Sequence, residues 1–262
     1  MHNMHGTSPA AKPDHVILKL GGSVITDKSA DCAINRAGLE ALAIAIAGAR
    51  HEGIVIIHGA GSCGHPEAKR YHLDRGATAG ATEGIYVTHR AVSGLNDAVV
   101  ETLRSKGVAA VGVHPLHTAV ADNGRLIGFE DRHLETMLAL GMVPVIHGDV
   151  VMDLSRGACI VSGDQLVRYL AAALSISRVG LATDVPGVLD GGRVVPEITR
   201  QTIATLHIGD SLHTDVTGGM RGKIDELLAL ADAGTESEIF HVSRVRDFLS
   251  GAATGGTRVR GK

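Results

Sequence analysis

The sequence predicts an α/β protein built on an open, mainly parallel twisted β-sheet that helices cover on both faces. Two observations carry this prediction. Apolar runs rich in β-branched residues alternate with segments of helical periodicity along nearly the whole chain. Several of these runs stop abruptly at glycine, where the chain can turn and approach a ligand closely. Ligands of such sheets bind beyond the carboxyl ends of the strands, which is where these glycine corners are expected.

The composition limits the size, partners and surroundings of the protein. With 262 residues, of which 44% are hydrophobic and 20% charged, the chain can form one large α/β unit or two lobes. The formal net charge of −3 and the lack of a Lys/Arg block argue against a nucleic-acid partner, and no apolar run has the length of a membrane span. Three cysteines, an odd number without metal-ligand spacing, favour a reducing compartment over a disulfide framework, so we expect a cytoplasmic protein.

The central feature of the sequence is an apolar strand at residues 55–58 that runs directly into a glycine turn. Gly59, Gly61 and Gly64 lack a Cβ and can adopt positive φ, so several backbone N–H groups can converge on one anion. His65 adds an imidazole beside them. The alternative is a tight strand-to-helix connection without a ligand, but further glycine corners elsewhere in the chain favour an anion site.

A second glycine corner follows the first predicted strand, residues 15–20. Lys19 lies near the exit of this strand, just before Gly21, Gly22 and Ser23. An ammonium group at this place can lie over a phosphate that the loop amides hold. The alternative is a solvent-exposed lysine at a sheet edge.

Two predicted helices flank the central strand. Asn35 is the expected N-cap of a helix over residues 36–50, and a long helix spans residues 82–103. One face of the long helix is apolar and follows the glycine turn closely in sequence, so it is either core or the lining of a substrate pocket. The candidate pocket residues on this face are Ile85, Thr88 and Val92.

The rest of the chain continues the alternation. It is predicted to contain strands at residues 108–113, 143–147, 178–182, 238–241 and 257–259, hairpins around residues 123–124 and 155–157, and helices at residues 132–140, 165–174 and 218–233, with a short helix ending at residue 249. Ser162 or Asp164 can cap the helix at 165–174.

Two of these strands end at corners that carry an aspartate. Asp149 follows Gly148, and Asp184 precedes Gly187. The last long helix begins at a further glycine pair and carries Lys223 near its start, which makes its N-terminus another anion site. The alternative role for both aspartates is that of a turn cap.

Together these features predict phosphoryl transfer between two phosphate-bearing ligands. The lysines at positions 19, 28 and 223, the glycine amides and the corner aspartates can neutralise and orient a moving phosphoryl group, which this reaction chiefly requires. A phosphate acceptor needs no general base, because its second pKa of about 6 leaves it mostly dianionic at neutral pH. The chain contains neither a G-x-x-x-x-G-K-[ST] element nor the H-R-D and D-F-G motifs of protein kinases.

The motifs also resemble a known family. The chain is similar to the amino acid kinase superfamily in motifs that occur in the same order over nearly its whole length, namely Lys19-Leu20-Gly21-Gly22-Ser23, the glycine turn, Gly148-Asp149, Thr183-Asp184-Val185-x-Gly187-Val188 and Thr217-Gly218-Gly219-Met220-x-x-Lys223. Within it the likeness is greatest to the isopentenyl phosphate kinase family, through Gly64-His65-Pro66, Ser162-Gly163-Asp164 and residues 215–220. Ala60 and Cys63 depart from the family pattern, which often has glycine and phenylalanine there.

The resemblance implies a fold and an activity. It implies an αβα sandwich over residues 14–262, after a flexible leader at 1–13, with an acceptor-binding lobe at about 14–177 and a nucleotide-binding lobe at about 178–262. It also implies ATP and Mg²⁺, a homodimer, and the conversion of isopentenyl phosphate to isopentenyl diphosphate.

The resemblance assigns roles by position as well. Lys19 would stabilise the transferred phosphoryl group and Asp149 would orient Lys19. The acceptor phosphate would be held by His65 with Gly59, Ala60, Gly64 and Gly163, and the acceptor tail by Ile85, Thr88 and Val92. The residues that would bind the nucleotide are Lys19, Gly21, Gly22, Ser23, Lys28, Asp184, Gly187, Gly218 and Lys223. No residue is expected to ligate a metal directly.

Two other kinds of function remain open at this point. Fosfomycin kinase shares the Gly-His turn and takes a phosphonate acceptor, whereas carboxylate kinases such as glutamate 5-kinase and acetylglutamate kinase are more distant. A non-catalytic nucleotide sensor on the same scaffold would be favoured by loss of Lys19, which is present.

Overall fold

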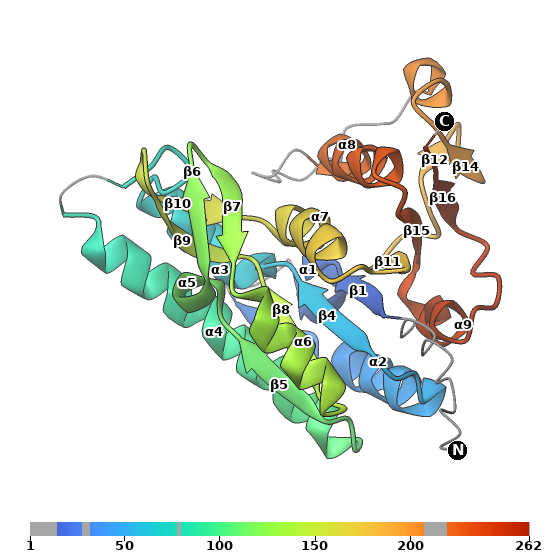
Figure 1. Ribbon diagram of the computed structural model, residues 1–262, viewed down its shortest axis with the longest axis horizontal. Helices are drawn as coiled ribbons and strands as arrows, with labels where there is room; N and C mark the ends of the chain where they lie inside the picture. Colours follow the sequence, from blue (N-terminus) through green and yellow to red (C-terminus); the bar gives the residue numbers. More distant parts are fainter. Residues whose placement is uncertain (1–14, 28–31, 78–79, 207–218, 262) are drawn as a thin grey trace, which may run out of the picture.

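The computed structural model describes residues 15–27, 32–77, 80–206 and 219–261, in which helices pack on a central sheet with a smaller sheet beside it (Figure 1). Within these residues the central sheet has the strand order β14-β16-β15-β11-β1-β4-β8-β5. Neighbouring strands are parallel except for β15 and β16. The bounds are β1 (Val16–Leu20), β4 (Ile54–His58), β5 (Ala110–Val113), β8 (Val143–His147), β11 (Arg178–Thr183), β14 (Glu197–Ile198), β15 (Glu236–His241) and β16 (Thr257–Val259). The predicted fold class is confirmed.

The register of the central strands brings the glycine corners to one edge of the sheet. Leu20 at the end of β1 pairs with His58 at the end of β4, and His58 pairs with His147 at the end of β8. Because the three strands are parallel and end at the same level, the corners that follow them at Gly21, Gly59 and Gly148 lie side by side.

Helices cover both faces because alternate residues of each strand point to opposite sides. Leu18 and Ile56 belong to one apolar cluster and Ile17 and Ile57 to the other. The first cluster includes residues of α2 (Arg36–Ala49), α4 (Thr82–Ser105) and α9 (Val245–Leu249), and the second includes residues of α6 (Asp131–Ala139), α7 (Gly163–Ala173) and α8 (Gly219–Asp232). Asn35 caps α2 as predicted, since its side chain accepts from the N–H of Gly38.

The smaller sheet consists of the two predicted hairpins. Its strand order is β10-β9-β6-β7, with bounds β6 (Ala119–Asp122), β7 (Arg125–Phe129), β9 (Asp149–Asp153) and β10 (Gly157–Val161). Asn123 and Gly124 both have positive φ, as a two-residue hairpin turn requires. The carboxylate of Asp153 accepts from the backbone N–H groups of Asn123, Gly124, Ser155 and Arg156, so one side chain ties the two hairpin turns together.

Apart from the helix α3 (Gly61–Arg70), the elements that were not predicted are short. Two-residue strands and single helical turns carry too few residues to show a periodicity. They are α1 (Gly22–Ile25), β2 (Thr26–Asp27), β3 (Ala33–Ile34), α5 (Pro115–Thr118), β12 (Leu189–Asp190), β13 (Arg193–Val194), β14, η1 (Thr202–Thr205) and η2 (Val242–Arg244). The helix α3 (Gly61–Arg70) follows the central glycine turn directly. No described helix is long and apolar enough to cross a membrane. The predicted leader lies outside the described residues.

One prediction from the cysteines is wrong. Cys32 and Cys63 form a disulfide, and Cys159 is buried and free. The β2–β3 hairpin folds back on the start of α3, where the Thr26 hydroxyl accepts from the N–H of Ser62, and this contact brings together two cysteines that are 31 positions apart. Neither the number nor the spacing of the cysteines contains that information.

Candidate active site

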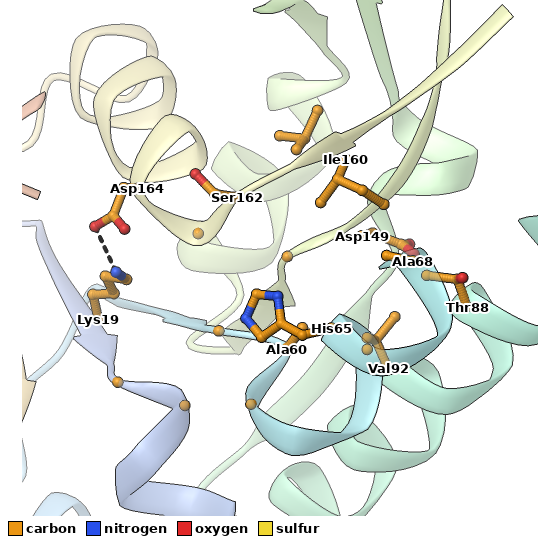
Figure 2. Close-up of a pocket in the computed structure, with 18 of the residues that line it drawn as sticks. Lys19, Ala60, His65, Ala68, Thr88, Val92, Asp149, Ile160, Ser162 and Asp164 are labelled. Atoms are coloured by element: carbon orange, nitrogen blue, oxygen red, sulfur yellow. Dashed lines mark hydrogen bonds and ion pairs between the residues drawn. The ribbon is translucent and has the colours of Figure 1, made fainter. Parts of the chain in front are cut away.

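A cavity lies where the glycine corners meet, beyond the carboxyl ends of β1, β4 and β8 (Figure 2). It brings together most of the residues predicted from the sequence, namely Lys19, Gly21, Gly22, Gly59, Ala60, Gly64, His65, Thr88, Val92, Asp149, Gly163 and Lys223. It is also lined by residues that were not predicted as site residues, including Ala68, Ile160, Ser162 and Asp164.

Some of the predicted residues do not line this cavity. Ile85 packs against the small apolar cluster formed by Leu73, Val150 and Ala158, because it lies on the same face of α4 as Val92 but about two turns nearer the start of the helix. Three others lie elsewhere: Ser23 is part of α1, Asp184 is exposed at the end of β11, and Gly187 is buried against Thr257. Lys28 and Gly218 lie outside the described residues.

One end of the cavity carries an ion pair. Lys19 is only 4% exposed, and its Nζ lies 2.5 Å from Oδ1 of Asp164. Asp164 stands in the first turn of α7, whose N-cap is Ser162 because its hydroxyl accepts from the N–H of Gln165 at 3.2 Å. The expectation that Asp149 orients Lys19 is therefore wrong. The motif Ser162-Gly163-Asp164 was the signal that could have identified Asp164, but it indicated only a helix start and a family likeness and gave no partner for Lys19.

Glycine is needed at the corners chiefly because loops approach one another closely. A Cβ on Gly22 would lie 2.6 Å from the Cα of Gly61, and a Cβ on Gly163 would lie 3.3 Å from Cε of Lys19. Of the three glycines in the central turn, Gly61 has positive φ, whereas Gly59 and Gly64 do not. A Cβ on Gly64 would overlap with Val92 across the helix interface. Some of the glycine amides are already engaged, since the N–H groups of Gly21, Gly59 and Gly64 donate to the carbonyls of Ala182, Leu20 and Ala60.

The electrostatics of the cavity, where the glycine corners and two helix N-termini meet, favour the binding of an anion. Helices α3 and α7 both begin at the cavity, and the first N–H groups of a helix have no partner within it. Figure 2 shows the ring of His65, from the first turns of α3, pointing into the cavity. The Lys19 ammonium lies on the other side of the same space. A phosphate group fits between these donors.

The opposite end of the cavity is mostly apolar, with Asp149 and the hydroxyl of Thr88 as its polar groups. In Figure 2 Ala68, Thr88, Val92 and Ile160 lie together at the end away from Lys19, with His65 between the two ends. The cavity therefore suits a ligand that joins an anionic group to a small apolar one.

Buried histidines hold the two central corners, at Gly59 and Gly148, through hydrogen bonds to their backbone. His58 and His147 end their strands, stack with ring centroids 5.7 Å apart, and each donates from Nδ1 to the carbonyl of the glycine that follows. Nε2 of His147 in turn accepts from Nδ1 of His114 at 2.9 Å. Burial lowers the pKa of His58, and it lowers that of His147 well below the ordinary value, so both are neutral supports. In the sequence these histidines are far apart and gave no signal.

The described residues offer no metal cage. No group of three or more His, Cys, Asp or Glu side chains among them is placed to hold a metal ion. The carboxylates that line the cavity are both engaged, Asp149 with His89 and Asp164 with Lys19.

Comparisons with known proteins agree with this geometry. The profile of the amino acid kinase family matches residues 14–241. The chain is 43% identical to the isopentenyl phosphate kinase of Haloferax volcanii, over 94% of this chain and 99% of that protein. It is 39% identical to the isopentenyl phosphate kinase of Methanothermobacter thermautotrophicus, again over 94% and 99%. An X-ray structure of an isopentenyl phosphate kinase superposes with a TM-score of 0.82 at 35% identity, covering 93% of this chain and 99% of that one.

Proposed function

Since the chain belongs to the amino acid kinase family, we propose that it transfers the γ-phosphoryl group of ATP to isopentenyl phosphate and so forms isopentenyl diphosphate. The observation that carries the proposal is the division of one cavity into an ionic end and an apolar end, with His65 between them. The acceptor phosphate would lie among His65 and the glycine amides, and its short hydrocarbon tail against Ala68, Val92 and Ile160.

Lys19 has the position of a group that acts on the transferred phosphoryl. It is buried at the ionic end, where its ammonium can neutralise charge that spreads over the phosphoryl oxygens in the transition state. Asp164 is then a positioning residue, because its carboxylate fixes the ammonium through the 2.5 Å ion pair. The acceptor oxygen attacks without a general base, since a phosphate monoester is mostly dianionic at neutral pH.

His65 and the helix N-termini compensate the charge of the acceptor. The imidazole of His65 and the start of α3 face the space where the acceptor phosphate would lie. They lower the cost of bringing two anions together. They also hold the acceptor in line with the phosphoryl group.

The residues fit Mg²⁺ only as an ion that enters with the nucleotide. In phosphoryl-transfer sites Mg²⁺ keeps several waters and is held by one or two carboxylates together with substrate phosphates. Asp164 is the carboxylate at the ionic end, and it is paired with Lys19. When bound, the ion would neutralise the β- and γ-phosphates.

The nucleotide side of the proposal rests mainly on the family resemblance. Lys223 lines the cavity, and Gly21 and Gly22 form its floor next to the ionic end. The proposal also keeps the division into an acceptor lobe and a nucleotide lobe, the homodimer and the cytoplasmic setting. Light scattering of the purified protein tests the homodimer.

A parallel substrate assay tests the function. The protein is incubated with ATP, Mg²⁺ and either isopentenyl phosphate, dimethylallyl phosphate, fosfomycin or acetylglutamate, and ADP release is followed. We expect the greatest kcat/KM with isopentenyl phosphate. A greater kcat/KM with fosfomycin or acetylglutamate would refute the assignment of the acceptor. If no ADP is released with any of the four compounds, the result would favour a nucleotide sensor.

A further inference from the structure

The apolar end of the cavity contains a charged group that the proposed chemistry does not use. Asp149 lies there near Ala68 and Thr88 (Figure 2), and its side chain has no exposed surface. A carboxylate with open hydrogen-bonding positions recruits water or a polar ligand group. Thr88 lies at the same end, and its Oγ1 is buried without a hydrogen-bond partner among the described residues, so the polarity of this end depends on Thr88 and on how Asp149 is satisfied.

Protein donors occupy both oxygens of Asp149. Oδ1 accepts from the N–H of Val150 at 2.9 Å, and Oδ2 accepts from the N–H of Leu116 at 3.2 Å. Nδ1 of His89 lies 3.0 Å from Oδ2 and 3.2 Å from Oδ1, and it must be the donor because a carboxylate only accepts. Among the described residues, His89 is the side chain that completes this set.

His89 is itself held in the required orientation. Ser93 lies one turn further along α4 and places its Oγ 3.2 Å from Nε2, and this contact helps to hold the ring with Nδ1 toward Asp149. The rings of His114 and His117 stand edge-on to that of His89, with centroids 5.7 and 5.1 Å away. The side chain of His89 is 16% exposed, which leaves it little room to turn.

We propose that His89 is a positioning residue that sets acceptor specificity. By donating to both oxygens of Asp149 it makes the carboxylate unavailable as a hydrogen-bond acceptor for water or ligand, and so favours phosphates with an apolar tail. This inference rests on the function proposed above, which supplies the phosphate acceptor. Without the imidazole, Asp149 keeps its two backbone donors, and water or a hydroxyl group of the ligand takes the vacant position.

A binding experiment separates this role from a general structural one. Calorimetry without nucleotide compares 3-methylbutyl phosphate with 3-hydroxy-3-methylbutyl phosphate, which share a carbon skeleton and differ by one hydroxyl group. The wild type should prefer the apolar ligand. In His89→Ala the ratio of the two affinities should fall by about tenfold, because the hydroxylated ligand gains a partner. His89→Asn should stay within about threefold of the wild type, since its amide N–H can replace Nδ1–H.

Two further variants serve as controls. His117→Ala removes an imidazole that packs on the ring of His89 but is not among the donors to Asp149, so the ratio should fall by less than about twofold. Ser93→Ala loosens the ring without removing it, so the ratio should fall by about twofold to threefold. If His89→Ala does not fold, as judged by circular dichroism and thermal melting, the Ser93 variant still decides the question.

Each outcome has a clear meaning. An unchanged ratio in folded His89→Ala, an unchanged ratio in Ser93→Ala, or equal effects of His89→Ala and His89→Asn would overturn the inference. A wild type that binds neither ligand, or prefers the hydroxylated one, would also overturn it. A wild type that shows the expected preference but does not phosphorylate isopentenyl phosphate would refute the proposed function and leave the role of His89 standing.

Discussion

The replacement of Lys19 by methionine tests the proposed chemistry most sharply, because it removes the charge and keeps most of the volume. Lys19 is 4% exposed and its Nζ is 2.5 Å from Asp164, so the ammonium is held in one place before the reaction starts. A fixed charge of this kind contributes on the order of 3 kcal/mol in the transition state, which corresponds to a loss of roughly 10²-fold in kcat. The KM for ATP should change much less.

The same substitution leaves Asp164 without its partner, and this second effect must be separated from the first. Removing one member of a buried ion pair costs about 3–5 kcal/mol of stability. The double variant Lys19→Met/Asp164→Asn removes both charges, so its free energy of unfolding should return toward the wild-type value while kcat stays low. Urea unfolding and steady-state kinetics of the three proteins provide the comparison. Near-normal kcat in Lys19→Met, or recovery of kcat in the double variant, would refute the role of Lys19.

Three further predictions concern the rest of the site. His65→Ala should raise the KM for the acceptor by about tenfold to a hundredfold with little change for ATP, while His65→Gln keeps part of the activity, and equal acceptor efficiency in all three proteins would show that His65 is structural. Val92→Phe should fill the apolar end and shift the preference toward shorter alkyl phosphates by about 1 kcal/mol per methylene, and an unchanged ranking would show that this side of α4 is core. Because burial lowers the pKa of His147 well below its ordinary value, the unfolded state takes up the proton first, so stability should fall as pH drops below about 6.5 by at most about 1.4 kcal/mol per pH unit for this group. Urea unfolding at pH 7.5, 6.5 and 5.5 should show a shallower decline in His147→Asn, and equal slopes would contradict this explanation.

The parts of the protein that could be predicted are those whose signal is local in the sequence. The strand at Ile54–His58 is a run of β-branched residues that stops at glycine, and this pattern indicates both a buried strand and a ligand corner. Because parallel strands end at one edge, the order of strands and helices along the chain is enough to assign the corner residues Lys19, Gly59 and Asp149 to one region.

The pairings between distant residues could not be predicted. The partner of Lys19 is Asp164, 145 positions away, and the register that brings them together depends on how α7 packs on the sheet. The same holds for Cys32 and Cys63. It also holds for His89, which meets Asp149 because α4 packs against β8 and β9. Contacts of this kind follow from tertiary packing, and a single sequence carries no local signal for them.

The central claim is that a phosphoryl group moves from ATP to the phosphate of an acceptor with a short apolar tail, and identification of the product tests it most directly. Phosphorus NMR of a reaction containing the protein, ATP, Mg²⁺ and isopentenyl phosphate should show the acceptor monophosphate resonance replaced by two coupled diphosphate resonances, in step with the appearance of ADP. Such a P–O–P bond should form with the wild type, and Lys19→Met should form it roughly 10²-fold more slowly. ADP accompanied by inorganic phosphate, with the acceptor resonance unchanged, would contradict the claim.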